Sequence, residues 1–86
     1  MKDLSSLRAE IDHLDKQLWE IIAQRMDIAR EIGEWKHTHD EPVLQSNRYL
    51  QVLDQCLQCA REKGISEDTV REVMDALHKE SVRVQS

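Results

Sequence analysis

An apolar residue recurs every three or four positions through the first 35 residues of the chain. The spacing holds for more than four heptads, which is the period of a helix that packs along another helix. The pattern therefore predicts one long helix, capped by Asp3 or Ser5 and ending near His37 or Thr38. The repeating positions, called the seam below, are Leu4, Leu7, Ile11, Leu14, Leu18, Ile21, Ile28, Ile32 and Trp35.

One position on the seam is charged, because Arg25 stands between Ile21 and Ile28. A guanidinium keeps its charge, and burying it without a partner is costly. Arg25 therefore needs either a buried carboxylate or an anionic ligand. No carboxylate lies on the same seam, which favours the ligand over a structural ion pair.

Two shorter helices are predicted after the break at residues 39–42, where Pro42 disfavours helix at the residue before it. The first starts near Ser46 and ends at Lys63-Gly64, with Gly64 suited to a left-handed position past the helix end. Ser66 then caps a third helix. The expected apolar stripes are Leu50, Leu53, Leu57 and Ala60 on the second helix, and Val70, Val73, Met74 and Leu77 on the third.

The composition indicates a single all-α domain spanning residues 1–86, because charged residues make up 34% and Phe is absent. The net charge of −5 gives no basic footprint for nucleic acid. No apolar run approaches the ~20 residues of a membrane span, and the N-terminus has no signal-peptide core. A lone Cys56-x-x-Cys59 fits a reducing compartment, so a cytoplasmic location is expected, with no metal or cofactor.

The length of the first helix predicts a second subunit. A helix of this length measures roughly 50 Å, whereas a compact chain of this size has a radius of gyration near 12 Å, or about 30 Å across. The seam would overhang such a globule and remain uncovered. An intertwined homodimer, with the long helices packed antiparallel, is the simplest closed arrangement.

Cations on the long helix form a candidate site. Arg25 and Lys36 are eleven residues apart, so they lie within about 20° of one another around the helix axis. Arg8 lies some 25 Å from Arg25 and is expected to reach the site of the other subunit in an antiparallel dimer. Ser81 and Gln85 stand one turn apart where apolar residues are due on the third helix, and Arg48 lies in the first turn of the second. The set predicts a ligand with several carboxylates.

These residues resemble the pattern of the all-helical chorismate mutases over nearly the whole chain. The resemblance implies a dimer of three-helix subunits that converts chorismate to prephenate. It also implies that Arg25 and the partner's Arg8 hold the substrate carboxylates, that Lys36 and Gln85 contact the ether oxygen, and that Arg48 and Ser81 complete the site. The matching residues are Leu7, Arg8, Ile11, Asp12, Leu14, Asp15, Arg25, Ile32, Gly33, Lys36, Pro42, Val43, Arg48, Ser81 and Gln85.

Two positions depart from the family pattern. Gln45 and Tyr49 stand where members of the family often have acidic residues, and both can still hydrogen-bond a ring hydroxyl. Isochorismate-pyruvate lyases resemble the same family, so lyase activity is the second hypothesis. The third is a non-catalytic helical dimerisation or regulatory domain of a larger shikimate-pathway enzyme. The resemblance also allows a shikimate-pathway enzyme that is fused to this chain or associated with it. Trp19 and Trp35 are interpreted as packing residues.

Overall fold

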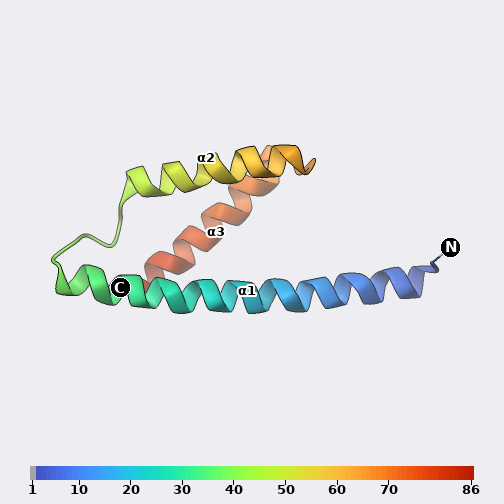
Figure 1. Cartoon of the computed structure of the whole chain (residues 1–86), viewed down its shortest axis with the longest axis horizontal. Coiled ribbons are helices and arrows are strands. Elements are labelled where there is room, and N and C mark those ends of the chain that lie inside the picture. Colours follow the sequence, from blue (N-terminus) through green and yellow to red (C-terminus); the bar gives the residue numbers. More distant parts are fainter. Residues whose placement is uncertain (1) are drawn as a thin grey trace.

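The computed structural model describes residues 2–86, which form three helices (Figure 1). The helices are α1 (Leu4–Thr38), α2 (Ser46–Glu62) and α3 (Glu67–Gln85). α3 runs obliquely between the other two helices and contacts both (Figure 1). The predicted all-α fold is confirmed. No helix in residues 2–86 is long and apolar enough to cross a membrane.

The helix ends follow local signals in the sequence. The Asp3 carboxylate accepts the N–H of Ser6 at 2.8 Å, and this hydrogen bond lowers the pKa of Asp3. The hydroxyl of Ser66 accepts the N–H of Thr69 at 3.2 Å at the start of α3. Gly64 adopts a φ of 72° after α2, a value that glycine accepts without steric cost. The three predicted boundaries are thus confirmed.

The main apolar core lies between α2 and α3 and consists of Leu53, Ala60, Val70 and Met74. Leu57 and Leu77 pack at its edge. Leu50 and Val73, the other two residues of the expected stripes, are 58% and 49% exposed in the single chain. Both residues follow the helical spacing of the core residues. They nevertheless lie outside the surface through which α2 and α3 pack against each other.

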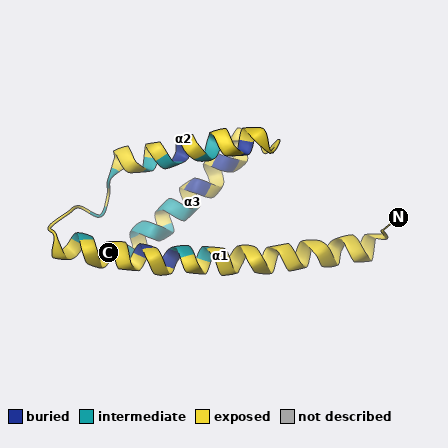
Figure 2. Cartoon of the chain, viewed as in Figure 1, coloured by how far each residue is buried: buried dark blue, intermediate teal, exposed yellow. Residues whose placement is uncertain are grey.

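The seam of α1 is uncovered in the single chain. Its apolar residues are between 44% and 60% exposed, and Figure 2 shows α1 exposed along its N-terminal half. The chain is 57 Å long with a radius of gyration of 16.2 Å. A compact chain of this length would have a radius of about 12 Å, so the predicted overhang of α1 is confirmed.

A second strip of α1, not the seam, packs against α3. Met26, Ala29 and Gly33 are buried, and each follows a seam position by one residue. One residue turns the helix by about 100°, so the packed strip and the exposed seam face different directions. Arg25 and Lys36 are half-buried at the boundary between the two strips.

Candidate functional site

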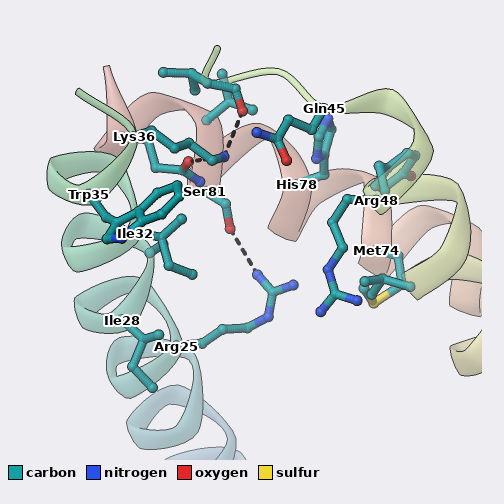
Figure 3. A pocket seen from close by; sticks show the side chains of 16 residues that line it. Arg25, Ile28, Ile32, Trp35, Lys36, Gln45, Arg48, Met74, His78 and Ser81 are labelled. Carbon is teal, nitrogen blue, oxygen red and sulfur yellow. Dashed lines mark hydrogen bonds between the residues drawn. The ribbon is translucent and has the colours of Figure 1, made fainter. Parts of the chain in front are cut away.

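A cavity of about 500 Å³ opens where all three helices and the connector after α1 come together (Figure 3). Three cations from two helices line it: Arg25 and Lys36 from α1, and Arg48 from α2. The other polar residues at its wall are Gln45, Tyr49, His78, Ser81 and Gln85, and the apolar ones are Ile28, Ala29, Ile32, Trp35, Val43, Val52, Met74 and Val82.

Arg25 has a hydroxyl partner in place of a carboxylate. Its Nη1 donates to Oγ of Ser81 on α3 at 2.8 Å, and the Ser81 hydroxyl in turn lies 3.8 Å from the sulfur of Met26. None of the ion pairs within residues 2–86 includes Arg25. Because a guanidinium carries five N–H donors, Arg25 keeps donors for an anion in the cavity.

Lys36 is fixed by two hydrogen bonds. Its ammonium donates to the backbone carbonyl of Val43 at 2.9 Å and to Oε1 of Gln85 at 2.7 Å. An ammonium has three N–H groups, so one remains for a ligand. The bond also orients the Gln85 amide, since its oxygen accepts from Lys36 and its NH₂ group is left as a donor. Two neighbouring groups can therefore donate to the same acceptor.

Gly33 allows α1 and α3 to meet at this point. A Cβ at Gly33 would lie 2.8 Å from Cα of Gln85 and 3.0 Å from its carbonyl oxygen. Such distances are shorter than van der Waals contact, so the backbone of α3 would have to move. The absence of a side chain at Gly33 thus places Gln85 beside Lys36.

Arg48 enters the cavity from the first turn of α2. Its side chain extends toward Arg25 across the open part of the cavity (Figure 3), and its Nη1 also donates to Gln51 at 3.1 Å. Gln45, just before α2, is half-buried and donates to the carbonyl of Pro42 at 3.3 Å. The predicted residues Arg25, Lys36, Arg48, Ser81 and Gln85 are thus brought together, with Gln45 and Tyr49 beside them.

Arg8 is the one predicted site residue that the single chain does not bring to the cavity. It is exposed on α1, seventeen residues before Arg25, which is about 25 Å along the helix. It lies on the N-terminal half of α1, which no other described helix covers (Figure 2).

Two aromatic residues of the cavity were not predicted to belong to it. His78 lies against Tyr49 with ring centroids 4.1 Å apart and ring planes tilted by 31°. It precedes Ser81 and Gln85 by three and seven residues on the same face of α3. That spacing was the signal that could have identified it. Trp35, expected only to pack, stacks on His39 at 4.0 Å and also lines the cavity.

Comparison with known proteins assigns the chain to a family. The family model described as chorismate mutase type II matches residues 7–86, a range that contains every candidate residue of the site. The chain belongs to the chorismate mutase type II family. Its similarity to that family therefore extends over the helices, the cavity and Arg8.

Individual relatives support the assignment to the chorismate mutase type II family. The chain is 33% identical over 81 residues to the T-protein of Haemophilus influenzae, of which it covers 22%. It is 33% and 31% identical to proteins named 4-amino-4-deoxychorismate mutase from Streptomyces pristinaespiralis and Streptomyces venezuelae, covering 64% and 81% of them. The chain thus spans about a fifth of the length of the T-protein and about two thirds of the length of the protein from Streptomyces pristinaespiralis.

The contact at Gly33 yields a test of how the site is built. Under the function proposed below, Gly33→Ala should lower kcat/KM for chorismate at least about tenfold, because the new methyl group displaces Gln85 from Lys36. Gly64→Ala is the matched control. A Cβ at Gly64 would meet nothing within 4 Å, but an alanine there would have to adopt the strained φ of 72°. That control should lose about 1 kcal/mol of stability and keep kcat/KM. Unchanged kcat/KM in Gly33→Ala would contradict the positioning role.

Proposed function

We propose that this chain is a chorismate mutase, an isomerase that converts chorismate to prephenate. The observation that carries the proposal is the hydrogen bond from Nζ of Lys36 to Oε1 of Gln85 at 2.7 Å, which leaves both side chains with free N–H donors. They line the same cavity as Arg25, whose guanidinium has no ion-pair partner within residues 2–86. Membership in the chorismate mutase type II family supports it.

The reaction suits a site made of fixed donors and cations. In this Claisen rearrangement the C–O bond of the enol ether breaks while a C–C bond forms within the same molecule. The step needs no external acid, base or nucleophile. The enzyme has to hold the side chain folded over the ring, which is an effect of orientation. It also has to stabilise the charge that develops on the ether oxygen.

Arg25 and Arg48 are the proposed carboxylate ligands of this chain. Both side chains reach into the cavity from opposite walls, and a guanidinium binds a carboxylate through two parallel N–H bonds (Figure 3). Ser81 holds the Arg25 guanidinium on the α3 side. A substrate with two carboxylates would be fixed at both ends, with the reacting bond between them.

Lys36 and Gln85 are the proposed ligands of the ether oxygen. Their mutual hydrogen bond leaves an N–H of the ammonium and the NH₂ group of the amide as donors. Donors that are already in place when charge develops contribute most to the rate, since nothing has to reorganise. Gln45 and Tyr49 are proposed to contact the ring.

A homodimer is proposed as the active form, with Arg8 of each chain entering the other chain's site. Apolar side chains along the whole seam are between 44% and 60% exposed, and a second copy would cover them. In an antiparallel pair with its two-fold axis near residues 18–20, Arg8 would lie opposite residues 28–32 of the partner subunit. It would thereby reach the cavity that the single chain leaves open.

A fused or associated pathway enzyme is also proposed, since the chain covers only 22% of the longer T-protein. A cytoplasmic location stays a prediction, to which the free thiols of Cys56 and Cys59 conform. Cys56 is half-buried, whereas Cys59 is exposed.

The proposed activity is tested by following the ultraviolet loss of chorismate and identifying the product. Prephenate is expected, with no pyruvate. A parallel assay with isochorismate measures pyruvate and so detects the lyase reaction. Turnover of isochorismate alone would contradict the proposal, and turnover of neither substrate would favour the non-catalytic module.

The neutrality of Gln85 can be tested through pH. The amide donates a hydrogen bond at any pH, whereas a carboxyl group does so only when it is protonated. Gln85→Glu should therefore lose activity at neutral pH and regain it as pH falls. A pH profile of kcat/KM equal to that of the parent would contradict the contact between Gln85 and the ether oxygen.

The shared site is tested by mixing two inactive variants. Arg8→Ala and Arg25→Ala homodimers should each be nearly inactive. After unfolding and refolding together in equal amounts, about half of the dimers should be mixed, and each mixed dimer should hold one intact site of two. Activity should then return to about a quarter of the parent value. No recovery, with mixed dimers demonstrated by mass spectrometry, would contradict the exchange of Arg8.

A further inference from the structure

The cavity combines several positive charges with no negative one. Arg25, Lys36 and Arg48 line it, and none of its described lining residues is Asp or Glu. Such a field favours an anion and opposes any positive charge on the bound molecule. The charges of the cavity therefore favour the carboxylates of the substrate. They also disfavour any positively charged substituent that the substrate carries elsewhere.

One wall of the cavity is polar but carries no carboxylate. It consists of Gln45, at the end of the connector before α2, Tyr49 in the first turn of α2, and His78 on α3. The rings of Tyr49 and His78 are in contact, with centroids 4.1 Å apart and planes tilted by 31°, which joins the two helices at this wall. In the view of Figure 3, Gln45 and His78 are drawn between Lys36 and Arg48.

These groups can pair with a neutral hydroxyl but not neutralise a cation. An amide, a phenol and an imidazole offer both donors and acceptors, and none is negatively charged at neutral pH. A hydroxyl on the substrate ring can donate to one of them and accept from another. An ammonium in the same place would have only neutral acceptors, with three fixed cations around the cavity.

We propose that the wall of Gln45, Tyr49 and His78 selects the ring hydroxyl of chorismate and rejects the ring ammonium of 4-amino-4-deoxychorismate. The inference rests on the proposed function and adds a choice between the hydroxyl and the amino substrate. The relatives leave this choice open, because two of them are named for the amino substrate. The two substrates differ at this one substituent. Discrimination therefore falls on the groups around it and not on the carboxylate ligands.

The experiment compares kcat/KM for chorismate and 4-amino-4-deoxychorismate in the parent chain and in variants. The parent should prefer chorismate by at least about tenfold. Gln45→Glu keeps the side-chain shape and adds a carboxylate at the wall, so it should shift the ratio toward the amine by at least about tenfold. The added negative charge also repels the two carboxylates, but it does so for both substrates. The ratio of the two kcat/KM values therefore reports only the effect of the hydroxyl or amino substituent.

Tyr49→Glu is the second variant and should move the ratio in the same direction. Gln55→Glu is the matched control, because Gln55 is exposed on α2 outside the cavity and the change in net charge is the same. Its ratio should equal that of the parent.

Each outcome has a defined meaning. A parent that turns over the amine as well as chorismate would overturn the selectivity while leaving the mutase function intact. An unchanged ratio in both Gln45→Glu and Tyr49→Glu, with both variants folded and active, would overturn the role of the wall. Turnover of neither substrate by the parent would overturn the proposed function and this inference together.

Discussion

The site depends on how closely α3 approaches α1 at Gly33. At that contact the backbone of Gln85 occupies the space that a side chain on α1 would fill. The same approach brings Ser81 to Arg25 at 2.8 Å and Gln85 to Lys36 at 2.7 Å. The two hydrogen bonds join residues that are 56 and 49 positions apart in the sequence. The contact between α1 and α3 therefore also sets the arrangement of the polar groups in the cavity.

α1 presents two apolar strips that are offset by about 100° around its axis. The buried strip at Met26, Ala29 and Gly33 packs on the helix of its own chain. The seam remains exposed, and the cations Arg25 and Lys36 stand at the boundary between the strips. A second copy that covered the seam would therefore border the cavity. For this reason the proposed dimer would also bring residues of the second copy close to the proposed site.

The sequence was most informative where a signal is local. Asp3, Gly64 and Ser66 each act within a few residues of their own position, and the helix boundaries they predicted are confirmed. Arg25 and Lys36 could be paired because a helix fixes their relative direction.

Other features needed the packing of distant segments. Leu50 and Val73 share helical spacing with core residues, and spacing alone does not show which side of a helix its neighbours cover. His78 and Trp35 belong to the cavity because of the angle at which α3 crosses α1. The proposed target of Arg8 lies on another chain, so packing within one chain leaves Arg8 exposed.

The most direct test of the account is calorimetric titration with a bicyclic dicarboxylate ether that mimics the folded transition state. The parent should bind one molecule per chain, and more tightly than it binds chorismate, because catalysis requires complementarity to the transition state. Arg25→Lys keeps the charge but loses the two-pronged contact, so it should weaken binding at least about tenfold. Equal affinity of the parent and Arg25→Lys for the mimic would contradict the central claim that Arg25 holds the substrate.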